Sequence, residues 1–246
     1  MSGPDLDCSI AEAKAICRLL SQHIFELSIA SSKTLSTQLP VRRSGAVRPA
    51  YVLTLLALEE AGKMFKIWQT GAKAEDDKSD RVVVESLFRD HEMKGGLASD
   101  LCCQMFETVA NWVIDMQKVE DPESQNYQLL SEMRRDLDKA VVHLKSVYQA
   151  YKAEREAAMY VSDDGNAGWN TRNQAVSEVI ESDNFLIWVV ASAANSYLKT
   201  EGSFSLAIKA LLDIRKGSQS DQAYAFYGRL MMGLAQQLGE AGKRGL

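Results

Sequence analysis

Proline and glycine are scarce in this chain of 246 residues, which contains only four prolines and fifteen glycines. Few residues therefore interrupt regular structure, and the many Ala, Leu, Lys, Glu and Gln residues favour helices over strands. The sequence also has no internal repeat, no low-complexity linker and no convincing strand. We therefore predict an all-α protein of about seven to eight helices, a single bundle with long antiparallel helices and extra C-terminal helices.

The chain has four cysteines, Cys8, Cys17, Cys102 and Cys103, and they lack the paired spacing of a metal site. Because no signal peptide is recognisable, we expect reduced thiols and a cytoplasmic protein with no resident metal or other cofactor. The longest apolar run, Phe185 to Ala194, is too short to span a bilayer. A net charge of -5 argues against a protein that coats nucleic acid unspecifically, since such binding depends on neutralising phosphates.

The stretch from Ala50 to Phe65 is apolar almost all the way round a helix, which is typical of a central, buried helix. Its middle nevertheless carries Glu59, Glu60 and Lys63, and charged side chains are seldom buried unless they are paired. Lys63 follows Glu59 by four residues and Glu60 by three, so its ammonium can reach either carboxylate. Gly62 costs helix stability and therefore predicts the close approach of another backbone or a ligand. An ordinary surface ion pair is the alternative interpretation.

The periodicity of apolar residues predicts further helices on both sides of this segment. In the first of them His23 falls on the apolar stripe and is expected to be a core histidine, and Pro49 suits the first turn of the central helix. His91 and Lys94 lie on the inward face of a helix that the pair Gly95-Gly96 is expected to stop. The predicted helices are Ile10 to Leu35, Ala50 to Gly71, about Ser79 to Lys94, Leu97 to Val119 with Met116 inward, Ser124 to Tyr160, Gln174 to Lys199, Phe204 to Arg215 and Asp221 to Gly239.

Several motifs in a fixed order suggest a family. The run Ala-Leu-Glu-Glu-Ala-Gly-Lys63 is followed by His91-x-x-Lys94, then by Lys152-x-x-Arg155 and Tyr160-Val161 before a loop with Gly and Trp. Over Ala11 to Arg172 this pattern resembles the AbiV family of bacterial abortive-infection proteins, which is placed among HEPN-like helical proteins. The resemblance implies a HEPN-like bundle over residues 1–172. It does not extend to the C-terminal helices of residues 173–246, and because no low-complexity linker separates them from the rest, we expect them to pack on the same bundle.

The resemblance implies the chemistry of HEPN ribonucleases, which cleave RNA without metal through an Arg-x(4-6)-His motif late in the bundle. This chain departs from that pattern, because no arginine has the required spacing to His143, the only histidine after Lys94. Arg18 and His23 have the spacing but lie in the first helix. After Arg155, a tyrosine stands at position 160 where such a histidine would stand, and a phenol is a poor base at neutral pH.

A composite site is the hypothesis that remains. Glu59, Glu60 and Lys63 would face His91 and Lys94, and Arg155 would complete a cationic pocket. In that site His91 is the general acid or base, with Glu59 and Lys63 as its catalytic partners; the binding residues are Glu60, Lys94, Lys152, Arg155 and Tyr160. The same groups could instead form a buried ion-pair network that fixes helix register, and the sequence leaves both interpretations open.

The resemblance implies a bacterial anti-phage abortive-infection protein that halts growth or translation on infection. The first hypothesis for its mechanism is a metal-independent endoribonuclease that acts on RNA. The alternative is a noncatalytic helical module that recognises a phage or host protein. A di-metal carboxylate protein is disfavoured, because the chain contains no Glu-x-x-His pair. The expected partners are RNA, a phage-encoded protein activator and a second copy of the chain, and we expect no contact with a membrane. The apolar seam of Ser124 to Tyr151 and the C-terminal helices offer a surface for a homodimer, and a monomer that uses the same faces internally is the alternative.

Overall fold

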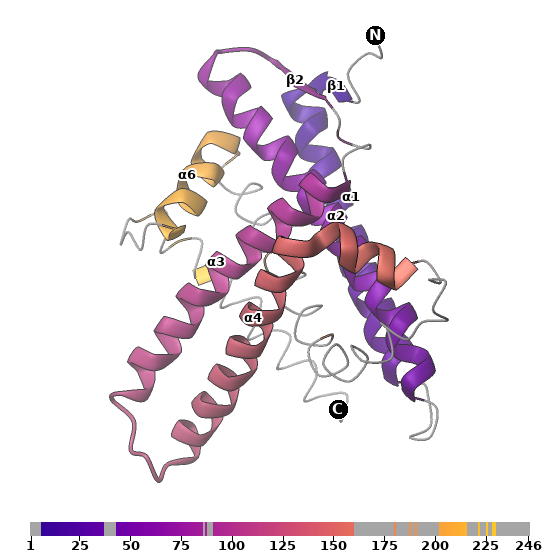
Figure 1. Ribbon diagram of the computed structural model, residues 1–246. Helices are drawn as coiled ribbons and strands as arrows, with labels where there is room; N and C mark the ends of the chain where they lie inside the picture. Colours follow the sequence, from indigo (N-terminus) through magenta and orange to yellow (C-terminus); the bar gives the residue numbers. More distant parts are fainter. Residues whose placement is uncertain are drawn as a thin grey trace.

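The computed structural model describes residues 6–36, 43–85, 87, 91–159 and 202–215, together with residues 180, 187, 190, 221, 225, 228 and 229. Long helices dominate this part of the chain, and the sheet has only two short strands (Figure 1). The predicted all-α bundle is therefore confirmed. The elements are β1 (Leu6–Ser9), α1 (Ile10–Ser36), α2 (Arg43–Asp76), β2 (Arg81–Val84), α3 (His91–Gln117), α4 (Gln125–Met159) and α6 (Phe204–Arg215).

Helix α1 packs along α2 and covers one side of it. The predicted bounds of α1 are confirmed to within one residue, and Ser31 from its last turns donates a hydrogen bond of 2.8 Å from Oγ to the carbonyl oxygen of Ala50. The prediction for His23 was wrong. Its side chain is 52% exposed, because the buried stripe of α1 passes through Ser21, Ile24 and Ser28 instead.

Helix α2 is the central, buried element that the sequence predicts. Leu55, Met64, Phe65 and Ile67 are almost completely buried although they point to different sides of the helix, as expected where neighbours cover several faces. The helix begins at Arg43, so Pro49 lies inside it and not in its first turn as predicted. A proline there leaves one carbonyl of the preceding turn without its helical partner.

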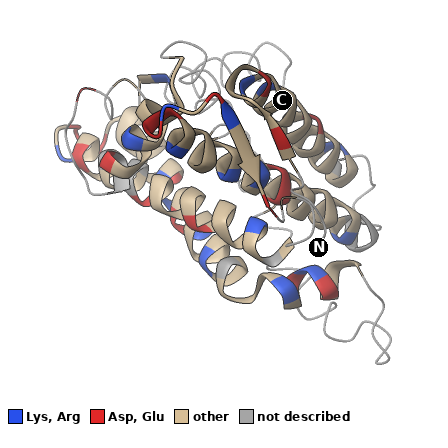
Figure 2. Cartoon of the chain, turned by 90° about the horizontal axis from the view of Figure 1, so that it is seen from above, with Lys and Arg blue, Asp and Glu red and all other residues tan. Residues whose placement is uncertain are grey.

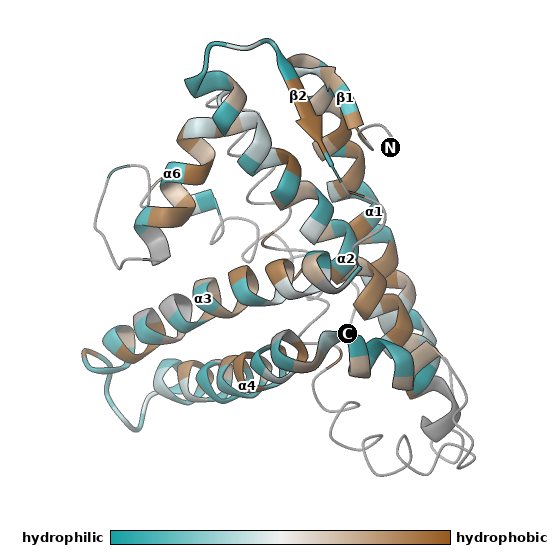
Figure 3. Ribbon diagram, turned by 45° about the horizontal axis from the view of Figure 1, so that its top comes forward, coloured by the Kyte–Doolittle hydropathy of each residue, from teal (hydrophilic) through white to brown (hydrophobic). Residues whose placement is uncertain are grey.

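The prediction that the chain has no strand, and that a helix begins near Ser79, was wrong. Residues Arg81–Val84 form β2, which pairs antiparallel with β1 in the register Leu6↔Val84 to Ser9↔Arg81. Three consecutive valines are β-branched and favour a strand, and Val82 and Val84 are buried while Val83 is 45% exposed. Figure 3 shows β2 as largely hydrophobic beside α1.

Helix α3 begins at His91 and runs straight through Gly95 and Gly96, which were expected to end a helix. The physical reason lies across the interface with α4. A Cβ at Gly95 would lie 2.2 Å from Cζ of Tyr151, so the ring occupies the space that a side chain would need. The glycine is therefore a packing position and not a helix stop.

Helices α3 and α4 form an antiparallel hairpin that extends away from α1 (Figure 1). The predicted seam of α4 is confirmed, since Leu137, Leu144, Val147 and Tyr151 are buried. Near the outer end of the hairpin Met116 was predicted to point inward, which was wrong because it is 48% exposed. Helix α4 changes direction at Ala150, whose φ of -134° and ψ of 28° are not helical.

Helix α6 packs on α2, and its bounds are those that the sequence predicts. The ring of Phe204 sits on Gly71, where a Cβ would lie 2.4 Å from Cδ2 of the ring. The two other C-terminal helices predicted from the sequence lie almost entirely outside the described residues. Lys and Arg are interspersed with Asp and Glu over the helices (Figure 2). Among the helices that the structure describes, none combines the length and the hydropathy needed to cross a bilayer.

Candidate functional site

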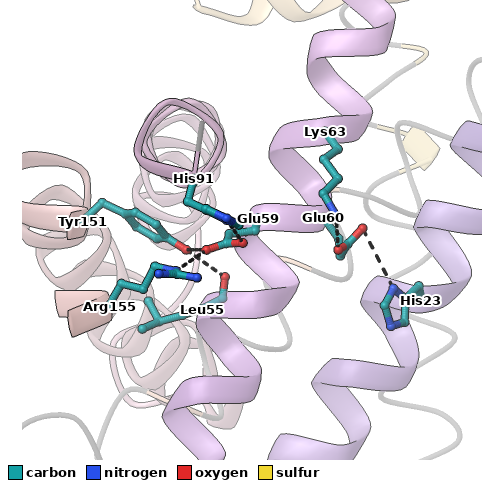
Figure 4. Close-up of polar contacts among 8 residues, drawn as sticks. All are labelled: His23, Leu55, Glu59, Glu60, Lys63, His91, Tyr151 and Arg155. Carbon is teal, nitrogen blue, oxygen red and sulfur yellow. Dashed lines mark hydrogen bonds and ion pairs between the residues drawn. The ribbon is translucent and has the colours of Figure 1, made fainter. Parts of the chain in front are cut away.

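The carboxylate of Glu59, in the middle of α2, collects side chains from two other helices (Figure 4). Its Oε2 lies 2.7 Å from Nδ1 of His91, the first residue of α3. Its Oε1 accepts hydrogen bonds from Nε of Arg155 at 2.8 Å and from the hydroxyl of Tyr151 at 3.0 Å, both on α4. We call Glu59, His91, Tyr151 and Arg155 the Glu59 cluster.

Burial makes the partners of Glu59 necessary. Only 4% of this residue is exposed, and a carboxylate removed from water costs several kcal/mol unless charge and hydrogen bonds compensate for it. Arg155 supplies the charge, while His91 and Tyr151 complete the hydrogen bonds. Burial and the nearby Glu59 carboxylate raise the pKa of Tyr151 well above its usual value, so the phenol stays protonated and donates.

The backbone brings these residues together at two close contacts. Helix α3 approaches α2 at Gly62, where a Cβ would lie 2.0 Å from the carbonyl oxygen of Lys94. The close backbone approach predicted for Gly62 is thus confirmed, and it places the start of α3 beside Glu59. On α4, the change of direction at Ala150 precedes Tyr151 and Arg155 directly. The end of α4 is thereby oriented differently from the outer part of the hairpin.

Glu60 and Lys63 were expected in the same site, but they lie on another side of α2 (Figure 4). Nζ of Lys63 is 2.5 Å from Oε1 of Glu60, and Oε2 of Glu60 is 3.9 Å from Nδ1 of His23 on α1. Neighbouring residues of a helix point about 100° apart, so Glu59 and Glu60 face different helices. Of the two pairings that the spacing allowed for Lys63, the structure has the one with Glu60.

The remaining predicted residues do not join the Glu59 cluster. Lys94 points inward as expected but is completely buried, so phosphate from solvent does not reach it in this conformation. Lys152 is exposed, and within the described residues no hydrogen bond or ion pair links it to Glu59. Tyr160 lies outside the described residues.

Tyr151 is the member of the cluster that sequence reasoning missed. It was assigned to the apolar seam of α4, and its ring is indeed buried there. A signal was present, because a tyrosine in the core needs a hydrogen-bond partner for its hydroxyl, and the buried Glu59 predicted for α2 is an acceptor. Here the hydroxyl lies 3.1 Å from the carbonyl oxygen of Leu55 as well as 3.0 Å from Glu59.

A second group of polar side chains lies further along the interface of α2 and α4. The hydroxyl of Tyr51 is 3.3 Å from Oε2 of Glu154 and 3.5 Å from Nε2 of His143. Tyr51 is completely buried and Glu154 is 9% exposed. Tyr51 thus resembles Tyr151 in its burial and in its hydrogen bond to a glutamate. Its glutamate partner is Glu154, however, and not Glu59.

The Glu59 cluster has the components of acid–base chemistry at a phosphate. The side chain of His91 is 43% exposed and that of Arg155 is 22% exposed, so both can be approached from solvent, whereas the carboxylate that holds them is 5% exposed. Because Nδ1 of His91 faces Glu59, the ring nitrogen left for a substrate is Nε2. Among the described residues, no group of three or more His, Cys, Asp and Glu side chains is placed to hold a metal ion.

Comparison with known proteins yields one family. The family model of AbiV, a HEPN family, matches residues 38–186, which is more than half of the chain and includes every member of the Glu59 cluster. No curated protein and no solved structure matches. The match confirms the resemblance seen in the motifs, and it shows that the chain belongs to the AbiV family.

Proposed function

We propose that this protein is a bacterial anti-phage abortive-infection protein that halts growth or translation on infection, and that the Glu59 cluster acts by cutting RNA without a metal. Membership of the AbiV family supports the first part. The second part rests on one observation: a single buried carboxylate holds both a histidine and an arginine that remain partly exposed. These are the two residue types that the HEPN motif supplies from one helix, here drawn from α3 and α4.

The proposed reaction uses each group at a defined place. Nε2 of His91 removes the proton from a ribose 2'-hydroxyl, and the 2'-oxygen then forms a bond to the adjacent phosphorus. The bond from phosphorus to the 5'-oxygen breaks, and the imidazolium returns its proton to that leaving oxygen. Arg155 offsets the negative charge that builds up on the phosphate oxygens. Glu59 fixes the tautomer of His91 and stabilises the imidazolium between the two proton transfers.

A noncatalytic function is the competing candidate, and one observation favours it. Glu59 is bonded by three side chains in a nearly dry setting, as in an ion-pair network that fixes the register of three helices. In that case the protein would stop growth by binding a phage or host protein. The homodimer, the phage-encoded activator and the cytoplasmic location stay predictions from the sequence.

The test is a phage challenge of cells that express matched pairs of variants. His91→Ala and Glu59→Gln alter the cluster, whereas His23→Ala and Glu60→Gln alter the equivalent residue types on the other side of α2. We expect the first pair to lose protection by roughly a hundredfold or more, as removal of an acid–base group does, and the second pair to keep it. Circular dichroism would establish that each variant is folded.

RNA profiling of the same infected cells separates the two candidates. Cleavage products that also form with purified, activated protein in the presence of chelator, and that disappear in His91→Ala, support the ribonuclease. Full protection with intact RNA would contradict it and favour the binding module. If folded His91→Ala and Glu59→Gln still protect, the cluster is only structural.

A further inference from the structure

Tyr151 has contacts that no role in the proposed reaction explains. Its hydroxyl lies 3.0 Å from Oε1 of Glu59 and 3.1 Å from the carbonyl oxygen of Leu55, so these two acceptors share its single hydrogen in a bifurcated hydrogen bond. Leu55 and Glu59 are one turn apart on α2, so the hydroxyl bridges the backbone of one turn and the side chain of the next. It does not contact His91 or Arg155 in the bonds described, and it is almost completely buried, so it cannot touch a substrate.

We propose that Tyr151 is a positioning residue: its hydroxyl fixes the rotation of the Glu59 carboxylate, and the carboxylate in turn fixes the imidazole of His91. This inference rests on the proposed function for its consequence in the cell, but its structural content can be tested by itself. The carboxylate of Glu59 has two oxygens with different duties, since Oε1 receives Arg155 and Tyr151 while Oε2 receives His91. A partial rotation about the terminal bond of the side chain would move both oxygens out of line with these donors.

The phenol is held in place from the other side by packing. Its ring lies on Gly95, where a Cβ would meet Cζ at 2.2 Å and Cε2 at 2.3 Å. Gly95 follows His91 by one turn of α3, so the same helix that carries His91 also provides the surface against which Tyr151 rests. The hydroxyl is therefore held by contacts with both α3 and α2. Tyr151 thus contacts the helix that carries His91 as well as the helix that carries Glu59.

The chemistry of the hydroxyl suits this role. At neutral pH the phenol is protonated, so it acts as a donor to the carboxylate and cannot repel it. A phenylalanine at this position would keep the ring on Gly95 and remove only the donor. The carboxylate would then keep Arg155 and His91 but lose one of the three bonds that hold its rotation, and a hydrogen bond to a charged group is among the stronger ones.

The experiment compares Tyr151→Phe with the wild type by proton and nitrogen NMR of protein labelled with ¹⁵N-histidine, with phage protection and RNA cleavage measured in parallel. An imidazole N–H that donates to a buried carboxylate gives a downfield, slowly exchanging proton signal, which His91→Gln would assign. We expect Tyr151→Phe to lose or broaden this signal while the circular dichroism spectrum stays native. Protection should fall roughly tenfold or more, the loss expected for a hydrogen bond to a charged group.

Two further variants sharpen the comparison. Tyr51→Phe removes the other buried phenol of the interface between α2 and α4, one that bonds Glu154 and not Glu59, and it should leave the His91 signal unchanged. Gly95→Ala keeps the hydroxyl of Tyr151 but displaces the ring, and it should reproduce the loss of the signal seen in Tyr151→Phe. If Gly95→Ala is not folded, the Tyr151→Phe and Tyr51→Phe pair still decides the matter.

The outcomes separate this inference from the proposed function. An unchanged His91 signal in folded Tyr151→Phe would overturn the positioning role, whatever happens to protection. Loss of the signal together with loss of protection supports both proposals. Loss of the signal with full protection and unchanged RNA would confirm that Tyr151 positions His91, and would contradict the proposal that the Glu59 cluster performs the reaction.

Discussion

At the scale of single residues, Gly62 sets how closely α3 approaches α2. A Cβ there would lie 2.0 Å from the carbonyl oxygen of Lys94 and 2.5 Å from its carbonyl carbon, and backbone atoms cannot rotate away as a side chain can. We therefore expect Gly62→Ala to lower the free energy of unfolding by about 3 kcal/mol, although alanine is the better helix former by about 1 kcal/mol.

Urea denaturation followed by circular dichroism measures the effect of Gly62→Ala. Gly228→Ala is the matched control, because a Cβ at Gly228 meets no atom within 4 Å, and this variant should be as stable as the wild type or slightly more stable. Equal stabilities for the two variants would mean that the close approach is not maintained in solution.

Sequence reasoning predicted the close approach at Gly62 and allowed the pairing of Lys63 with Glu60, but it placed that pair in the site of Glu59, for a geometric reason. The energetic cost of a glycine within a helix is visible in the sequence, so its compensation could be predicted. Two adjacent carboxylates point about 100° apart on any helix, but which helix each of them faces depends on the helices that cover α2, and that is a property of the tertiary structure. His23 was misplaced for the same reason, since its spacing fits a stripe one position away from the one that is buried.

At the scale of elements, Glu75 near the end of α2 secures the start of α6. It accepts a hydrogen bond from the backbone N–H of Ser205 at 2.9 Å and another from Oγ of Ser203 at 2.7 Å, and Lys14 of α1 lies 3.4 Å away. Burial by itself would raise the pKa of Glu75, but these hydrogen bonds and the lysine outweigh it, and the pKa is lowered from its usual value. One carboxylate thus joins α1, α2 and α6.

The lowered pKa gives a defined dependence on pH. The ionised form of Glu75 is favoured by the fold, so its contribution is fully present above pH 4.5, the ordinary value, and is lost as the pH falls below it toward the lowered value. Hydrogen exchange of α6 measured from pH 7 to pH 3.5 should show its protection falling at the acid end. In Glu75→Gln protection should be weaker at pH 7 and should depend less on pH. An acid response identical to that of the wild type would exclude this carboxylate as the cause.

The elements themselves could be predicted from the sequence wherever one face stayed apolar over many residues. This was so for α1, α4 and α6, whose bounds differ from the predicted ones by a residue or less. The prediction of a helix over Arg81–Val84 was wrong because four residues can continue a helical pattern by chance. The partner strand β1 also lies more than seventy residues earlier in the chain. The prediction that a helix ends at Gly95 was wrong because this glycine makes room for the ring of Tyr151, a contact that the sequence does not reveal.

At the scale of the whole molecule, the four cysteines are all buried and all free, so their reactivity reports on opening of the fold. Burial raises the pKa of the Cys17 thiol to about 12, and only the thiolate reacts rapidly with alkylating reagents. At pH 8 we expect alkylation of Cys17 in the native protein to be no faster than global unfolding. In denaturant the thiol has its ordinary pKa of about 8.5, and alkylation should be complete within minutes.

Mass spectrometry of the protein after timed alkylation measures this directly. The rate at Cys17 should follow the stability of the variants, so that Gly62→Ala is modified faster than Gly228→Ala. Rapid labelling of Cys17 in the native wild type would show that α1 separates from α2 without global unfolding.

The packing of α1 on α2 has a consequence for what the family's segment can do in isolation. The matched region begins at residue 38, after α1 has ended, and it closes at residue 186, before α6 begins. Yet α2 runs between these two helices, and its buried residues, among them Trp68 and Phe65, depend on such neighbours for cover. The segment that the family model matches therefore lacks two of the helices that pack on α2. Transferred alone into another protein, this segment would carry the Glu59 cluster without the helices that cover α2.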